Sequence, residues 1–462
     1  MLDLLLIQPA CFDVVSPNMG LGYVAESARQ AGYSVELFDL NRRLLDLCRP
    51  DELEYWQNWF LPKWIEHPLY NGEIRDRFGD RIDGLIAEIC SISARFYGLF
   101  ISRSTNPNGL NIAREVHRLK PWAGAKVLVG GDDCQHERVA YNHFNHIPYV
   151  DHVVMGEGEV VIPKVLSGEA LVAGKFIPGE PAANLDEYAW PTYLEAPPKA
   201  FAKGQMMIMG SRGCRWARCR ICPDRYDGWF RARSGRNIFE EVAYHRREHG
   251  VQTFALADPM FNGDERMVAG FCEEIEKGGL GPLAFNCQMS FSHSLPESLV
   301  ERLAAVGMGN VIFGLESGSQ AIVDEMRKGF KIAKAEETLR LYQEHGIRTH
   351  VNIIVGFPTE TPEDFEATLT FLQRNAGHLY QVEENNHFRI YTDHSDCGTN
   401  FVYENLDRYG IDPETLSEDR WVSQGGRLDL EERLRRQALV EELCASLGLG
   451  RSYKKVGVTL AD

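Results

Sequence analysis

The 462-residue sequence predicts an α/β protein in which two parallel sheets follow each other along the chain. Short apolar segments alternate with helical ones up to about residue 180, and the alternation starts again at Gln205 after a stretch rich in Pro and Ala. Such alternation is typical of parallel strands connected by helices. We therefore expect domains at 1–180 and 205–400, a linker at 181–204 and a helical C-terminal segment at 401–462.

The first domain is expected to be a doubly wound, Rossmann-like sheet. Its predicted elements are strand Leu2–Gln8, helix Met19–Gln30 and strands Ser34–Phe38, Gly98–Ser102, Lys126–Val129 and Val153–Met155. Ligands of such sheets bind beyond the carboxyl ends of the strands, where Gly, Asp and Asn collect in this sequence. Residues 42–95 form an aromatic-rich insertion. We expect its aromatic side chains to pack on the sheet; the alternative is a cap over a large flat ligand or the substrate.

The second domain is expected to be a partial (β/α)6 barrel. Its predicted strands are Met206–Met209, Thr253–Leu256, Ala284–Met289, Val311–Phe313, His350–Val355 and Phe388–Tyr391. Six βα units are fewer than the eight of a closed TIM barrel, so the barrel should be open. Near the C-terminus, Leu430, Leu434, Ala438 and Leu443 fall roughly on one helical face and indicate a structural brace.

Composition and charge narrow the class of function. The 49 Lys and Arg against 66 Asp and Glu give a net charge of -17, which disfavours a broad grip on nucleic acid, so no nucleic-acid partner is expected. No run of eighteen apolar residues and no basic leader occur, and we expect a cytoplasmic protein without a membrane span. The odd count of 11 cysteines argues against a disulfide framework.

Three of these cysteines fall within nine residues, in the loop after the first strand of the second domain. The loop reads Gly210-Ser-Arg-Gly-Cys214-Arg-Trp-Ala-Arg-Cys219-Arg-Ile-Cys222. Soft thiolates select zinc or iron–sulfur clusters. A structural zinc site needs four closed ligands, and the loop supplies three, so the zinc alternative would borrow a remote Cys or His. A four-iron cluster bound by three cysteines would leave one iron open to a ligand that is not protein.

This loop and two later motifs resemble the radical SAM superfamily. The family's usual loop is Cys-x3-Cys-x2-Cys, and here the first spacing is one residue longer. Phe313-Gly-Leu-Glu316-Ser317-Gly318-Ser319 looks like the family's Glu-Ser-Gly-Ser strand end, and Asn352-Ile-Ile354-Val-Gly356-Phe-Pro-Thr-Glu360 resembles its adenine-lining stretch. The resemblance implies a [4Fe-4S] cluster on Cys214, Cys219 and Cys222. It also implies S-adenosylmethionine contacts at Glu316, Ser317, Gly318, Asn352, Ile354 and Gly356.

The first domain resembles the cobalamin-binding domain that precedes one large radical SAM subgroup. The resemblance rests on Pro17–Ala25, Val35–Asn41, Val129–Asp132 and Asp151–Glu159. It implies cobalamin contacts at Met19, Gly20, Ser102, Gly130, Gly131, Asp132, Gly156, Glu157 and Gly158. The sequence has no Asp-x-His-x-x-Gly motif, so any bound cobalamin should lack a His ligand from that motif. Each glycine can also be read as a turn residue that supplies positive φ.

The leading hypothesis is a cobalamin-dependent radical SAM enzyme that methylates an unactivated carbon. Residues at the carboxyl ends of the strands are the candidates for contacting the substrate. Tyr391, Asp393 and His394 would bind the substrate or move a proton; the alternative is that they are ordinary loop residues. Further candidates are Asp258, Asn286, Gln288 and Arg389. The expected partners are a small-molecule or peptide substrate and an external electron donor such as flavodoxin or ferredoxin. Two alternatives stay open: a radical rearrangement or cyclisation with the same cofactors, and a non-catalytic cobalamin-binding sensor or assembly protein.

Overall fold

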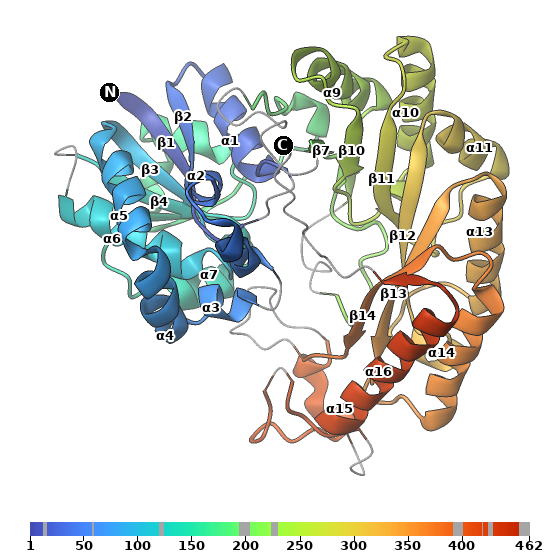
Figure 1. Cartoon of the computed structure of the whole chain (residues 1–462). Helices are drawn as coiled ribbons and strands as arrows, with labels where there is room; N and C mark the ends of the chain where they lie inside the picture. The colour runs from blue at the N-terminus through green and yellow to red at the C-terminus, as the bar shows by residue number, and fades with distance from the viewer. Residues whose placement is uncertain are drawn as a thin grey trace. The chain divides into compact units, whose positions relative to one another are not determined.

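The computed structural model of the chain (Figure 1) describes residues 1–12, 16–57, 60–119, 124–193, 204–222, 230–390, 401–417, 419–423 and 428–451. These residues form two compact units, and the division falls between Met206 and Met207. Each unit is built on its own parallel sheet, as the sequence predicts.

The sheet of the first unit has six parallel strands in the order β2-β1-β3-β4-β5-β6. The predicted doubly wound fold is confirmed, and β1 has the predicted bounds. The third predicted strand lies earlier than expected, and a sixth strand that the sequence did not reveal is added at the edge. The strands are β1 (Leu2–Gln8), β2 (Val35–Asp39), β3 (Ala94–Phe100), β4 (Lys126–Gly130), β5 (His152–Met155) and β6 (Phe176–Pro178).

Helices follow the strands of this sheet, and the aromatic-rich insertion is helical. The α-helices are α1 (Met19–Gln30), α2 (Leu40–Asp46), α3 (Leu61–Ile65), α4 (His67–Leu69), α5 (Arg75–Ser91), α6 (Asn106–Leu119), α7 (Glu137–Phe144) and α8 (Val161–Ser167). Shorter helical turns are η1 (Pro50–Trp56), η3 (Tyr70–Ile74), η4 (Asp132–Cys134), η5 (Ala170–Ala173) and η6 (Leu185–Glu187).

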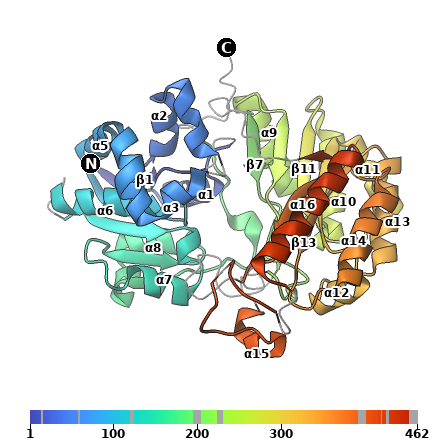
Figure 2. The ribbon, with the colours of Figure 1, turned by 60° about the horizontal axis from the view of Figure 1, so that its bottom comes forward.

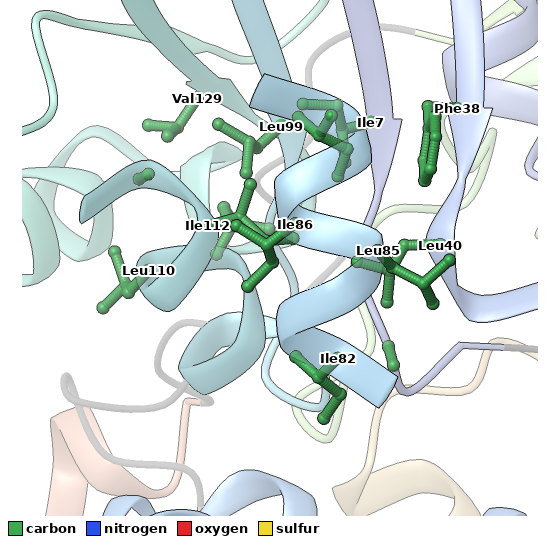
Figure 3. Packing of buried hydrophobic residues seen from close by; sticks show 14 of the residues in the cluster. Ile7, Phe38, Leu40, Ile82, Leu85, Ile86, Leu99, Leu110, Ile112 and Val129 are labelled. Carbon is green, nitrogen blue, oxygen red and sulfur yellow. The ribbon is translucent and has the colours of Figure 1, made fainter. Parts of the chain in front are cut away.

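The aromatic side chains of the insertion are core residues. Tyr55, Trp56, Trp64 and Tyr70 are buried in the same apolar cluster as Phe78 of α5. Figure 3 shows other side chains of α5 in this cluster, close to side chains from the strands and from α6. The prediction that the insertion packs on the sheet is therefore confirmed for these four aromatics; Trp59 lies outside the described residues.

The second unit contains a parallel sheet in the order β15-β14-β13-β12-β11-β10-β7. Its strands follow one another across the sheet in sequence order, with helices between them, and the predicted open barrel is confirmed. The predicted last strand, Phe388–Tyr391, is wrong, because β14 ends at His387. The strands are β7 (Gln205–Ile208), β10 (Thr253–Leu256), β11 (Ala284–Met289), β12 (Met308–Glu316), β13 (Arg348–Val355), β14 (Gln381–His387) and β15 (Gly450–Arg451), with a separate antiparallel pair β8 (Ser211–Arg212) and β9 (Arg231–Ala232).

The helices of the second unit cover the outside of this sheet (Figure 2); α13 and α16 contact β13, and α14 contacts α16. The helices are α9 (Gly235–Glu248), α10 (Glu265–Gly278), α11 (Glu297–Ala305), α12 (Gln320–Glu325), α13 (Ile332–Glu344), α14 (Pro362–Asn375), α15 (Leu406–Tyr409) and α16 (Leu430–Ser446), with turns η9 (Phe261–Gly263) and η10 (Tyr403–Asn405).

The buried face of α16 differs from the predicted one. Its buried residues are Arg433, Arg436, Val440 and Cys444, while the predicted face includes Leu434, which is 46% exposed. The helix does pack on β14 and α14. Two arginines lie on its buried face because they find hydrogen-bond acceptors there, as described below.

Candidate functional site

Asp258 holds the start of the cysteine loop. Its buried carboxylate follows β10 and accepts the backbone N–H of Gly210 at 2.9 Å and the hydroxyl of Ser211. Burial raises the pKa of Asp258 to about 6, while these two donors act in the opposite direction. The predicted strand-end candidate Asp258 is therefore an anchor of the loop.

The middle of the cysteine loop is attached to the turn that follows α12. The indole N–H of Trp216 donates to the carbonyl oxygen of Arg327 at 2.6 Å. The backbone N–H of Arg220 donates to the carbonyl oxygen of Met326 at 2.9 Å. Gly329 has a φ of 77°, and a Cβ there would lie 2.2 Å from Cζ2 of Trp216. Only a glycine leaves room for this indole ring, so the loop and the turn are fitted to each other.

A buried ion pair lies beside the loop. Nζ of Lys328 is 2.9 Å from Oε1 of Glu316, and the two side chains are 12% and 9% exposed. Burial by itself would lower the pKa of Lys328, but Glu316, Cys219 and Cys222 act in the opposite direction, and the pKa lies above its ordinary value. Lys328 is therefore a cation that is paired with the Glu316 carboxylate beside the cysteine loop.

The three cysteines form a donor set that suits an iron–sulfur cluster. Cys214, Cys219 and Cys222 are partly buried thiols, and burial raises the pKa of Cys219 although Lys328 lowers it in part. Across the described residues, no three His, Cys, Asp or Glu side chains are close enough to hold one metal ion. Three thiols are one fewer than a closed zinc site needs, whereas a four-iron cluster on three cysteines leaves one iron open to a ligand that is not protein. The donor set therefore suits a cluster better than a closed zinc site.

The predicted S-adenosylmethionine residues at the end of β12 have different surroundings. Glu316 has a φ of 67° and keeps its carboxylate beside Lys328. Gly318 donates its N–H to Oγ1 of Thr368 on α14 at 3.0 Å, and the Ser317 hydroxyl lies 3.1 Å from the same atom. Ser317 and Gly318 thus fix the strand end to α14, and the polar group that faces the loop is the Glu316 carboxylate.

The predicted residues of β13 also separate into two groups. Oδ1 of Asn352 is buried and has no hydrogen-bond partner in the described part of the chain. Such an atom is stabilised when a ligand or water supplies a donor. Ile354 contacts an apolar cluster. Gly356 has a φ of 76°, and a Cβ there would lie 2.5 Å from Cγ of Arg433, so this arginine covers it. Asn352 is the residue of this group with an unused polar atom.

The remaining candidates of the second unit are placed as follows. Tyr391, Asp393 and His394 lie outside the described residues. Asn286 and Gln288 lie on one face of β11, where Asn286 is half-buried and Gln288 is exposed. Nε of Arg389 is 3.1 Å from Oδ1 of Asp419.

The predicted cobalamin-binding residues of the first unit lie beyond the carboxyl ends of its strands. The strand order 2-1-3-4-5 is that of flavodoxin-like folds, which bind ligands where the order reverses between β1 and β3. The nine residues follow the carboxyl ends of four strands: Met19 and Gly20 after β1, Ser102 after β3, Gly130, Gly131 and Asp132 at the end of β4, and Gly156, Glu157 and Gly158 after β5.

Local contacts fix the loops that follow these strands. The N–H of Ser102 donates to Oγ1 of Thr105 at 2.8 Å. Gly131 has a φ of 110°, and a Cβ there would lie 2.7 Å from the carbonyl oxygen of Ile101, so a glycine is needed for the loop after β4 to approach the loop after β3. Glu157 accepts the hydroxyl of Tyr188 at 2.8 Å.

Sequence reasoning missed Lys328, Trp216 and Thr368. Lys328 follows Glu316 by twelve residues, with α12 between them, and no local pattern connects the two. The dipeptide Lys328-Gly329 looks like an ordinary helix end, because a basic residue and a glycine are common there. The signal that could have found the pair is the approach of two segments, which a sequence alone does not show.

Comparison with known proteins shows what the chain is similar to. Residues 208–372 match the family model of the radical SAM superfamily. The relatives include an uncharacterized methyltransferase of Pyrococcus horikoshii, 25% identical over 49% of this chain and 53% of its own length. They also include a putative methylthiotransferase of Methanocaldococcus jannaschii, 27% identical over 54% and 57%. The chain spans about half the length of these curated relatives.

Solved structures share the fold over most of the chain. The cobalamin-dependent S-adenosylmethionine radical enzyme OxsB is 17% identical, with a TM-score of 0.64 over 82% of this chain and 53% of its own. The radical S-adenosylmethionine methyltransferase TsrM from Kitasatospora setae is 16% identical, with a TM-score of 0.64 over 96% and 88%. Residues 208–372 thus carry the sequence features of the radical SAM superfamily. The fold of the chain is that of cobalamin-dependent radical SAM enzymes, so the resemblance stated from the sequence is confirmed.

Helices long and apolar enough to cross a membrane are absent from the described part of the chain.

Proposed function

We propose that this protein uses a [4Fe-4S] cluster, S-adenosylmethionine and cobalamin to methylate an unactivated carbon of a small-molecule or peptide substrate. The observation that carries the proposal is the position of the cysteine loop. Its three thiols lie with the Lys328–Glu316 pair beyond the carboxyl ends of β7 and β12, the edge at which parallel barrels place their chemistry. The flavodoxin-like first unit supports the cobalamin part of the proposal.

Each group of residues has a proposed role. Cys214, Cys219 and Cys222 hold the cluster, and Glu316 accepts the amino group of S-adenosylmethionine. The unpartnered Oδ1 of Asn352 accepts a donor from the adenine. When bound, the cofactors supply a 5′-deoxyadenosyl radical for hydrogen abstraction and a methyl group for transfer, with electrons from a donor such as flavodoxin or ferredoxin. Tyr391, Asp393 and His394 stay proposed as residues that bind the substrate or move a proton.

The first test is anaerobic reconstitution with iron, sulfide and cobalamin. We expect about four irons per chain, the count of a [4Fe-4S] cluster, and 5′-deoxyadenosine from S-adenosylmethionine under strong reductant. Cys214→Ala, Cys219→Ala and Cys222→Ala should each lose both signals. Cys90→Ala is the matched control, because Cys90 is also a partly buried free thiol but lies on α5 of the first unit. Bound zinc, or iron without 5′-deoxyadenosine, would favour the non-catalytic alternative.

Methyl transfer can be tested before the substrate is known. S-adenosylmethionine carrying a trideuterated methyl group is incubated with the cobalamin-loaded protein and reductant, and the cobalamin is analysed by mass spectrometry. Labelled methylcobalamin supports a methyltransferase. Deoxyadenosine without labelled methylcobalamin supports a rearrangement or cyclisation, an outcome that gains weight because another relative is an anaerobic magnesium-protoporphyrin IX monomethyl ester cyclase of Rubrivivax gelatinosus, 27% identical over 48% of this chain and 44% of its own.

A further inference from the structure

The loop that carries the cysteines contains four arginines, of which the buried Arg220 is paired with Glu325. A further cation, Lys328, approaches the loop from another segment of the chain. Arg215 and Arg218 are exposed, and their guanidinium groups lie over the rings of Phe230 and Trp216. Lys328 is 12% exposed, and its neighbours Met326 and Arg327 accept N–H groups of the cysteine loop, from Arg220 and Trp216. A buried charge is screened far less than an exposed one, so Lys328 has a larger electrostatic effect on the thiols than Arg215 or Arg218.

The position of Lys328 is fixed from three sides. Its ammonium group lies 2.9 Å from Glu316. A Cβ added to Gly314 would lie 2.9 Å from Nζ of Lys328 and 2.7 Å from Oε1 of Glu316, so the ion pair lies directly over a glycine of β12. The neighbouring residue Arg327 accepts the indole N–H of Trp216, which ties the backbone at Lys328 to the cysteine loop. The backbone at Lys328 is therefore held by the cysteine loop, and its ammonium group is held by Glu316.

We propose that Lys328 is a positioning residue that stabilises the reduced state of the cluster on Cys214, Cys219 and Cys222. The inference rests on the proposed cluster but concerns a residue with no role in the family motifs quoted above. One electron from an external low-potential donor converts the [4Fe-4S]²⁺ core to [4Fe-4S]¹⁺, and no bond to Lys328 forms or breaks. Reduction adds one negative charge to the cluster, and a fixed cation nearby makes that charge less costly.

Glu316 opposes this effect. In the ion pair its negative charge lies beside the charge of Lys328 and offsets part of it at the cluster. Removal of the Glu316 charge should therefore make reduction of the cluster easier.

The test is an electron paramagnetic resonance titration of the reconstituted protein, without substrate, over a series of potentials. In Lys328→Met the ratio of reduced to oxidised cluster at a fixed potential should fall by about tenfold, equivalent to about 59 mV for a one-electron couple. Glu316→Gln should change the ratio in the opposite direction. Lys331→Met is the matched control, because Lys331 lies three residues away, is 69% exposed and pairs with Asp324; its ratio should equal that of the wild type.

The outcomes separate this inference from the proposed function. A wild type that holds no four-iron cluster contradicts both. Four irons in the wild type and in Lys328→Met, with equal potentials, contradict the inference alone. If Lys328→Met fails to assemble the cluster, iron is measured in Lys328→Arg: iron retained there supports a role of the charge, and iron lost there too overturns it in favour of a purely steric role.

Discussion

Nη1 of Arg436 on α16 lies 2.7 Å from Oε2 of Glu360, and the same carboxylate oxygen accepts the N–H of Gly356 at 2.7 Å. Both charged side chains are almost completely buried, at 4% and 1% exposed. The C-terminal helix is therefore joined to the end of β13 by a charged contact beside the stretch that was predicted to line the adenine.

The first prediction concerns the glycine in this contact. Gly356→Ala should lower the free energy of unfolding by about 2–4 kcal/mol, because the new Cβ overlaps Arg433 and the residue must also keep its positive φ. Gly346 has a similar φ of 78° but no atom within 4 Å of a built Cβ, so Gly346→Ala measures the cost of φ alone. Chemical denaturation of both variants measures how much the overlap with Arg433 adds to the loss of unfolding free energy. Equal losses would show that Arg433 moves aside freely.

A second prediction concerns the pH dependence of Glu360. Burial raises the pKa of Glu360 to about 7, against an ordinary value of 4.5, although Gly356 and Arg436 lower it in part. The folded protein then holds this proton more tightly than the unfolded chain does. The stability from Glu360 is fully present below pH 4.5 and is lost as the pH rises through 7.

The measurement for Glu360 compares wild type with Glu360→Gln. The unfolding free energy of the wild type, relative to the variant, should fall between pH 5 and pH 8 by up to about 3 kcal/mol, at about 1.4 kcal/mol per unit of pKa shift. Glu363→Gln is the control, since Glu363 is exposed in the first turn of α14. A difference that is flat with pH would mean that Glu360 ionises normally.

A third prediction tests the anchor of the cysteine loop. Asp258→Ala leaves the N–H of Gly210 and the hydroxyl of Ser211 without their acceptor, which should cost about 2–3 kcal/mol of stability. The loop should also hold iron less firmly, measured as faster iron loss to a chelator. Asp324→Ala is the control, because this aspartate is 54% exposed and pairs with Lys331 at the surface. Unchanged iron loss would assign Asp258 to stability alone.

A fourth prediction distinguishes a core role of the aromatic insertion from a ligand cap. Trp64 is fully buried, and its indole N–H donates to the carbonyl oxygen of Tyr55 at 2.8 Å. Trp64→Ala should lower stability by about 3–5 kcal/mol, with or without cobalamin present. Tyr380→Ala, at a position 49% exposed, should have a much smaller effect. A loss of cobalamin affinity at unchanged stability would instead support the cap.

The sequence by itself determined the two parallel sheets and the cysteine loop. Leu2–Gln8 has the predicted bounds because burial on both faces leaves an apolar run that can be read locally. Ala284–Met289 also has the predicted bounds, and there every second residue is buried. The cysteine loop could be found because its donors are neighbours in sequence. The order of motifs along successive strands then predicted the superfamily.

The tertiary structure alone decided which polar residues have partners. Arg433 and Arg436 look like surface residues of an amphipathic helix, yet they are buried because the loops after β13 and β14 supply acceptors. Lys328 is beside the cysteines because α12 turns the chain back toward the loop. Such contacts join segments far apart in sequence, and a buried charge is stable only where its partner is brought to it. Hydrophobic patterning is local, and charge pairing in the interior is not.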